Sequence, residues 1–163
     1  MKHLIITTAT IPEDICYQQL GYSYVQRMKD YKLSFDHALK FRENFDTITI
    51  LETVAKEKVD ELEECGINVY YSKFNNSFSN KGLNEIFHIQ DFLNNSNFND
   101  DDLIIKITGR YLMVNDNILN IDSNIVAKYD GDIYPGDRGV HTFFFGIKKN
   151  IFNQFIKSLY RLY

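Results

Sequence analysis

The sequence contains few cysteines, the residues that cross-link small folds and often bind metals. It has only two cysteines in 163 residues, Cys16 and Cys65, and no CxxC pair. A disulfide framework and a cysteine-ligated zinc finger therefore have no support. Tryptophan is absent, but 13 phenylalanines and 11 tyrosines help to bring the hydrophobic share to 44%. Such a composition indicates a packed core and not a disordered chain.

Long apolar runs and an excess of basic charge are also missing. The apolar part of the N-terminal segment MKHLIITTAT is too short for a signal peptide or a membrane span. We therefore expect a cytoplasmic protein with no transmembrane segment. The net charge of −4 argues against a general nucleic-acid binder. The length fits one domain, which we expect to span residues 1–163.

Several catalytic signatures are absent as well. The sequence contains no Ser-His-Asp order, HExxH, Walker loop or GxGxxG, and its segment LGYSY is not a nucleophile elbow. Hydrolase, nucleoside-triphosphatase and dinucleotide-dehydrogenase functions therefore lack their usual chemical parts.

Short β-branched and apolar runs alternate with helical patterns along the chain. The predicted strands are 3–9, 46–51, 67–71, 103–108, 125–129 and 141–147. The first predicted helix runs from Pro12 to about residue 31, with Ile15, Leu20, Tyr24, Val25 and Met28 inward, and a shorter one covers 36–43. A third begins at a Thr53 cap, has the apolar face Val54, Ala55, Val59 and Leu62, and ends at Gly66. The last two contain Leu83, Ile86, Phe87 and Leu93 at helical spacing, and the residues after an Asn150 cap. This order predicts an α/β fold with a mainly parallel central sheet and helices on both faces.

Ligands of such open sheets bind beyond the C-terminal ends of the strands, so the residues there are the candidates. Lys106 is the sharpest anomaly, because a central strand covered on both faces should be continuously apolar. A lysine there must reach solvent or an anionic partner. Arg110 follows just past the strand, and Gly109 would let the backbone approach a ligand closely. Lys106 and Arg110 could meet a diphosphate, and the alternative is a structural ion pair with an acid.

Two further candidates lie at the same predicted edge. The segment Asn80-Lys81-Gly82 precedes a helix, where backbone N–H groups attract anions and Lys81 adds charge. The alternative is ordinary helix entry with Asn80 as the cap. Glu52 ends the second strand and could accept hydrogen bonds from a ribose or base. A glutamate there is equally plausible as a charge at a helix N-terminus.

A possible metal site lies in the C-terminal third of the chain. Asp130 and Asp132, one residue apart, offer oxygen ligands suited to magnesium or manganese, and Asp137 is near in sequence. Asp-Gly is also a common turn pair, so a simple turn is the alternative. His141 opens the segment HTFFFG and could be a metal ligand, a base or a hydrogen-bonded edge residue.

Five segments together resemble a family. They are LIITTATIP, ILET, NKGLNE, DDLIIKITGRY and GVHTFFFGIKK. The chain resembles GT-A type glycosyltransferases over nearly its whole length, most of all the small bacterial and large-DNA-virus members that build capsule, lipopolysaccharide or capsid glycans. KITGRY is the most specific piece. The sequence differs from the family's pattern at Lys106 and Arg110, which occupy the place where such enzymes usually hold a metal-binding DxD.

The resemblance implies a nucleotide-diphospho-sugar donor and a glycan or other hydroxyl acceptor. The implied donor-binding residues are Thr7, Thr8, Ala9, Glu52, Asn80, Lys81, Lys106, Thr108, Gly109 and Arg110. Either the basic residues replace the metal's charge, or Mn²⁺ or Mg²⁺ is held elsewhere, by Asp130, Asp132 and His141. Asp137 or Asp132 would be the catalytic base for the acceptor hydroxyl. The alternative function is a non-catalytic module that binds a nucleotide or sugar.

Overall fold

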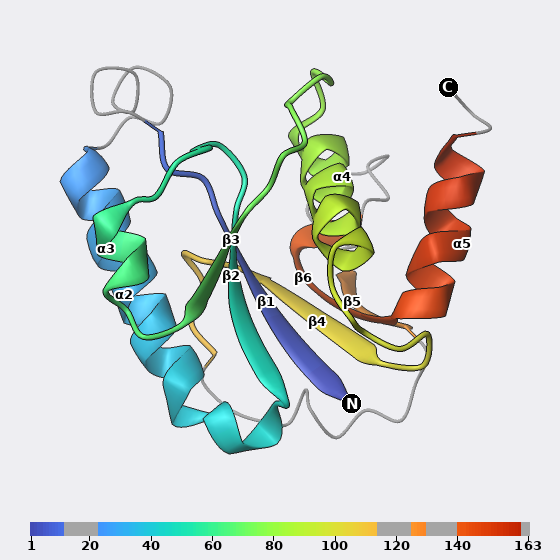
Figure 1. Ribbon diagram of the computed structural model, residues 1–163, viewed down its shortest axis with the longest axis horizontal. Coiled ribbons are helices and arrows are strands. Elements are labelled where there is room, and N and C mark those ends of the chain that lie inside the picture. The colour runs from blue at the N-terminus through green and yellow to red at the C-terminus, as the bar shows by residue number, and fades with distance from the viewer. Residues whose placement is uncertain (12–22, 114–124, 130–139, 161–163) are drawn as a thin grey trace.

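The computed structural model describes residues 1–11, 23–113, 125–129 and 140–160, with the backbone alone described at 125–129 and 140–143. They form one six-stranded sheet with helices packed against it (Figure 1). The strands are β1 (Lys2–Thr8), β2 (Thr47–Glu52), β3 (Asn68–Tyr71), β4 (Leu103–Thr108), β5 (Ile125–Tyr129) and β6 (Val140–Lys148). The helices are α2 (Tyr24–Lys40), the short 3₁₀ helix η1 (Arg42–Asn44), α3 (Asp60–Glu63), α4 (Lys81–Asn94) and α5 (Lys149–Leu159).

The sheet has the strand order β3-β2-β1-β4-β6-β5. Strands β3, β2, β1 and β4 are parallel neighbours, whereas β6 runs antiparallel to β4 and β5. The predicted α/β fold with a mainly parallel central sheet is therefore confirmed. The predicted strands are all present, and their ends agree with the structure to within one residue.

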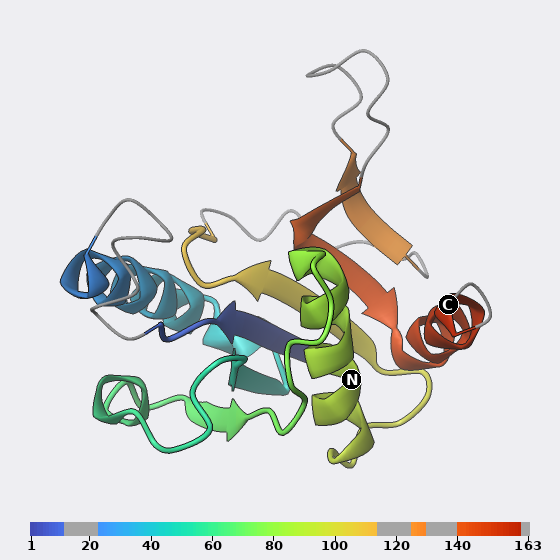
Figure 2. The same cartoon turned by 90° about the horizontal axis from the view of Figure 1, so that it is seen from above.

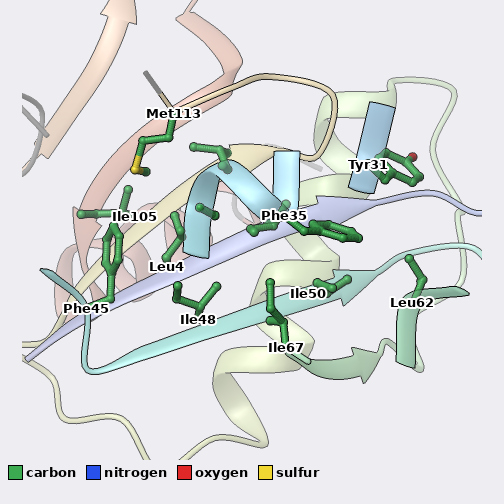
Figure 3. Packing of buried hydrophobic residues seen from close by; sticks show 13 residues of the cluster. Leu4, Tyr31, Phe35, Phe45, Ile48, Ile50, Leu62, Ile67, Ile105 and Met113 are labelled. Carbon is green, nitrogen blue, oxygen red and sulfur yellow. The ribbon is translucent and has the colours of Figure 1, made fainter. Parts of the chain in front are cut away.

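Alternate strand residues supply two hydrophobic clusters, one on each face of the sheet. On one face, Leu4 of β1 and Ile105 of β4 belong to the same cluster as Tyr31 and Phe35 of α2 (Figure 3). On the other face, Ile5 belongs to a cluster that includes residues of α4 and α5. The view from above shows α2 and α4 on opposite sides of the strands (Figure 2). Helices on both faces, as predicted, follow from apolar side chains that alternate along β1 and β4.

The first helical region differs from its prediction. The described part is the single helix α2 (Tyr24–Lys40), in place of two helices that end near 31 and cover 36–43. Ser23 caps it by accepting from the N–H of Gln26, and no glycine or proline interrupts it. Its buried stripe contains Tyr31 and Phe35, whereas Val25, predicted to face inward, is 52% exposed. Residues 12–22, with Pro12, Ile15, Cys16 and Leu20, lie outside the described residues.

The helix predicted from Thr53 to Gly66 is mostly wrong. Only α3 (Asp60–Glu63) is helical, because the N–H groups of Val54 and Ala55 donate to the Glu52 carboxylate and hold this segment in a turn. Helix α3 ends at Glu63, before the expected Gly66. Gly66 follows with φ of 75°, a left-handed conformation that suits glycine.

The final helix begins one residue earlier than its predicted cap. Asn150 lies inside α5, and the N–H groups of Lys149 and Asn150 donate to the carbonyls of Asp102 and Asp100. Backbone carbonyls of a neighbouring loop therefore replace a side-chain cap. None of the helices in the described part of the chain is both long and apolar enough to cross a membrane.

Candidate functional site

A pocket of about 580 Å³ opens around the C-terminal end of β1. The parallel strands place their C-terminal ends at this edge of the sheet, which is where open α/β sheets bind ligands. Six of the predicted donor-binding residues line the pocket: Thr7, Thr8, Ala9, Lys81, Thr108 and Arg110. The other four, Glu52, Asn80, Lys106 and Gly109, are not among its lining residues. The structure therefore brings part of the predicted set around one pocket at this edge and leaves the rest outside the pocket's lining.

The sheet's pleat divides the predicted residues between its two faces. Thr7 pairs with Thr108 and Thr8 pairs with Glu52 in the register of the strands. Because alternate residues point to opposite faces, Thr7, Lys106 and Thr108 lie on the α4 face. Thr8 and Glu52 lie on the α2 face. The pocket curves around the edge between the two faces, since both Thr7 and Thr8 line it.

Lys106 is fully buried and forms an ion pair, as the alternative interpretation of the sequence allowed. Its ammonium lies 2.8 Å from Oε1 of Glu85 and donates to the hydroxyl of Thr108 at 2.9 Å. The hydroxyl of Thr7 donates to the same Glu85 oxygen at 2.6 Å. Burial lowers the pKa of Lys106, and Glu85 opposes that shift. Lys106 is therefore connected to the pocket through its lining residues Glu85 and Thr108. The sequence interpretation missed Glu85.

Gly109 is required by the protein's own packing. A Cβ at this position would lie 3.0 Å from Cδ1 of Tyr31, 3.1 Å from Cγ2 of Thr8 and 3.2 Å from the carbonyl oxygen of Thr7. The N–H of Gly109 also donates to that Thr7 carbonyl at 2.8 Å. The close approach predicted for a ligand is thus an approach between β1, α2 and the end of β4. Arg110, the next residue, lines the pocket.

Glu52 is completely buried and its carboxylate is engaged by the protein. It accepts hydrogen bonds from the N–H and hydroxyl of Thr10, from the hydroxyl of Thr8, and from the N–H groups of Val54 and Ala55. These bonds join the segment after β1 to the segment after β2. The geometry favours a structural role in shaping the pocket over the predicted contact with a ribose or base.

Asn80 is the N-cap of α4, the alternative that the sequence left open. Its side-chain oxygen accepts from the N–H groups of Gly82 and Leu83, so these two groups are not presented to an anion. Lys81 and Gly82 still line the pocket. One turn into the helix, the buried Asn84 bonds to the N–H and carbonyl of Phe78 and fixes the loop that forms this wall.

Arg27 and Tyr31 form a second wall that the sequence interpretation missed. The Nε–H of Arg27 donates to the carbonyl of Ala9 and to the Tyr31 hydroxyl, each at 2.9 Å. That hydroxyl also accepts from the N–H of Ala9. Burial raises the pKa of Tyr31 to about 12, with Arg27 acting against the shift. An arginine within the apolar stripe of a helix was the signal that could have identified this pair.

His88 lines the pocket as a neutral side chain. Burial, followed by the nearby Lys56, lowers the pKa of His88 to about 4. Its Nδ1 is 2.8 Å from Oγ of Ser72, and its Nε2 is 2.9 Å from Oδ1 of Asn76. The hydroxyl of Ser72 is in turn bonded to the carboxylate of Asp91. Since both ring nitrogens are bonded, His88 fixes the wall and is poorly suited to take a proton from a substrate.

The pocket is cationic although the whole chain is acidic. Among the described lining residues, Arg27, Lys81 and Arg110 carry positive charge. The one carboxylate among them, Glu85, is ion-paired with Lys106. The chain's net charge is −4. A cationic pocket in a chain of this charge is suited to an anionic ligand such as a phosphate group.

The predicted metal and base residues lie beyond what the structure describes. Asp130, Asp132 and Asp137 are outside the described residues, and at His141 only the backbone in β6 is described. In the described part of the chain, no group of three or more His, Cys, Asp or Glu side chains is arranged to hold a metal. The Mn²⁺ or Mg²⁺ site and the catalytic base remain predictions.

Comparison with known proteins shows the fold and no family. No protein-family model matches the sequence. No curated protein matches it either. The chain is similar in structure to 4-diphosphocytidyl-2C-methyl-D-erythritol synthase from Anaerococcus prevotii, with a TM-score of 0.52 and 16% identity. That similarity covers 97% of this chain and 76% of the synthase. It establishes the type of fold, a mixed α/β arrangement.

Proposed function

We propose that this chain is a glycosyltransferase that moves a sugar from a nucleotide-diphospho-sugar donor to a glycan or other hydroxyl acceptor. The observation that carries the proposal is the cationic pocket at the C-terminal edge of the parallel sheet. Arg27, Lys81 and Arg110 reach it from α2, from α4 and from the end of β4. Support also comes from the resemblance carried by KITGRY and from a fold shared with an enzyme whose name contains a diphosphocytidyl group.

The pocket's charges suit the departure of a nucleoside diphosphate. When the acceptor oxygen displaces this group at the anomeric carbon, negative charge increases on the departing phosphate. Fixed cations in a partly enclosed site stabilise that charge without reorganising at the moment of reaction. In the proposed mechanism Arg27 and Arg110 do this, and Lys81 adds charge from the first turn of α4. Asp137 or Asp132 would accept the proton of the acceptor hydroxyl.

A divalent cation is proposed as an optional part of the donor complex. Asp130 and Asp132 offer carboxylate oxygens, which Mg²⁺ and Mn²⁺ bind readily, and His141 offers an imidazole nitrogen. A diphosphate carries enough negative charge for both a metal and the cationic side chains. In the metal-independent alternative, the basic residues neutralise the leaving group alone.

A donor-hydrolysis assay tests the proposal. Wild type is incubated with a panel of UDP-, GDP-, CDP- and ADP-sugars, with manganese or with EDTA, and release of nucleoside diphosphate is measured. We expect release from at least one donor, a reduction of about tenfold or more in Arg110→Gln, and no change in the control Lys32→Gln. Lys32 is exposed on α2 and is not among the pocket's lining residues.

The other outcomes separate the alternatives. Thermal stabilisation by a nucleoside diphosphate without any turnover would assign a non-catalytic binding module instead. Release of pyrophosphate from a nucleoside triphosphate would assign nucleotidyl transfer. Full release in EDTA would show that no divalent cation is needed. The absence of both turnover and stabilisation would refute a nucleotide-binding function of either kind.

A further inference from the structure

The wall that α4 contributes to the pocket contains one carboxylate, and its two oxygens differ. Oε1 of Glu85 receives the hydroxyl of Thr7 at 2.6 Å and the ammonium of Lys106 at 2.8 Å. No hydrogen bond joins Oε2 to any residue of the described chain. Glu85 lines the pocket and its side chain is 19% exposed. The protein therefore fixes one oxygen and leaves the other available to a ligand.

The cost of burying Lys106 suggests that this arrangement serves more than stability. The lysine is 0% exposed, and burial lowers its pKa even though Glu85 is adjacent. A buried ion pair is commonly no more stabilising than an apolar pair of the same size. In the fold, the lysine's ammonium bonds to Glu85 and Thr108. One effect of these bonds is to hold the Glu85 carboxylate in one position at the pocket wall.

The chemistry of Oε2 limits what it can bind. An ionised carboxylate only accepts hydrogen bonds, so its partner must be a donor. It repels phosphate, and the ammonium of Lys106 at 2.8 Å from the other oxygen disfavours a metal cation. A nucleotide sugar offers donors on its base, its ribose and its sugar. The base N–H groups change position from one base to the next, whereas the ribose hydroxyl groups recur in every member of the class and the sugar supplies further hydroxyl groups. Sugar hydroxyls commonly bind to carboxylates through such charge-assisted bonds.

We propose that Oε2 of Glu85 accepts a hydrogen bond from a hydroxyl group of the ligand, either on the ribose or on the transferred sugar, and so makes Glu85 a specificity-determining residue. The inference rests on the proposed function, since it requires a nucleotide or nucleotide sugar in this pocket. Arg27 and Arg110 come from the α2 side and the end of β4, whereas Glu85 comes from α4. A phosphate at Arg27 and Arg110 and a hydroxyl at Glu85 would thus meet different walls, with Lys81 at the start of the α4 wall, and this arrangement would fix the ligand's orientation.

The test measures how a ligand hydroxyl and the carboxylate depend on each other. Calorimetric affinities are determined for ADP, CDP, GDP and UDP, for their 2′-deoxy and 3′-deoxy counterparts, and for the matching nucleotide sugars with and without single sugar hydroxyls. Inorganic pyrophosphate serves as the probe of the phosphate site alone. The variants are Glu85→Gln and the double variant Glu85→Leu, Lys106→Met. The double variant replaces the ion pair with apolar side chains and avoids leaving a buried lysine without its partner.

In wild type we expect loss of one particular hydroxyl to weaken binding about tenfold to a hundredfold. In the double variant the same loss should have less than about a twofold effect, while pyrophosphate binding is retained. If the deoxyribose nucleotides bind more weakly, the partner of Glu85 is a ribose hydroxyl. If the deoxygenated nucleotide sugars bind more weakly, the partner is a hydroxyl of the sugar. An unchanged discrimination ratio in the double variant, or none in wild type, would overturn the role of Glu85 alone. Failure of wild type to bind any nucleoside diphosphate or pyrophosphate would overturn the proposed function as well.

Discussion

At the scale of single residues, several of the predicted ligand-binding side chains are engaged by the fold itself. Lys106 could be recognised from the sequence because a lysine interrupts an apolar strand. Its partner could not, since Glu85 looks like any other charge on an amphipathic helix until α4 is packed on the sheet. Gly109 was expected to let a ligand approach the backbone, but the sequence could not show that Tyr31 lies against it.

His88 provides a prediction about the pH dependence of stability. Its pKa is lowered from 6.5 to about 4 by burial and by Lys56, with Asp91 and Glu52 acting in the opposite direction. As the pH falls from above 6.5 towards 4, His88 therefore binds a proton in the unfolded state but stays neutral in the folded state. The stability present above pH 6.5 is lost over this range, by up to about 3 kcal/mol.

Urea denaturation at a series of pH values measures this effect. The free energy of unfolding of wild type is compared with that of His88→Gln, which keeps a hydrogen-bonding side chain but cannot be protonated. Between pH 6.5 and 4, we expect the free energy of unfolding to fall more steeply in wild type than in the variant, because only wild type has His88 to protonate on unfolding. Parallel pH profiles for the two proteins would refute the assignment of this titration to His88.

At the scale of elements, strands were predicted better than helices. Strand ends follow from short β-branched runs with turn residues on either side, which are local signals. The segment after β2 has a helical pattern of apolar residues, but the buried Glu52 carboxylate binds its first N–H groups and holds a turn. A tertiary hydrogen-bond acceptor of this kind overrides local propensity, and the sequence alone does not disclose it. The two predicted helices merge into α2 for a local reason instead, since no glycine or proline interrupts residues 24–40.

Glu52→Gln tests whether that carboxylate organises the turn. Replacing one oxygen with an amide NH₂ places a donor opposite N–H and hydroxyl donors, so we expect a loss of about 2–4 kcal/mol in the free energy of unfolding. Glu57→Gln, at an exposed position of the same segment, should change stability by less than about 0.5 kcal/mol. Equal, small effects in both variants would show that the Glu52 charge is dispensable for the fold.

At the scale of the whole molecule, the fold creates a site that no local motif encodes. The parallel strands bring Thr7, Thr8 and Thr108 to one edge, and α2 and α4 approach it from opposite faces. The fold class was predictable, because alternating strands and helices imply a parallel sheet. The walls were not, because Arg27, Glu85 and His88 come from helices whose rotation depends on packing with the sheet.

The central claim is that this pocket holds the diphosphate of a nucleotide. A crystal structure of the protein grown with UDP or GDP, with and without manganese, tests it most directly. The account predicts phosphate oxygens within hydrogen-bonding distance of at least two of Arg27, Lys81 and Arg110, with the nucleoside extending along the edge of the sheet. A nucleotide bound on another surface, with this pocket containing only water at saturating ligand, would contradict it.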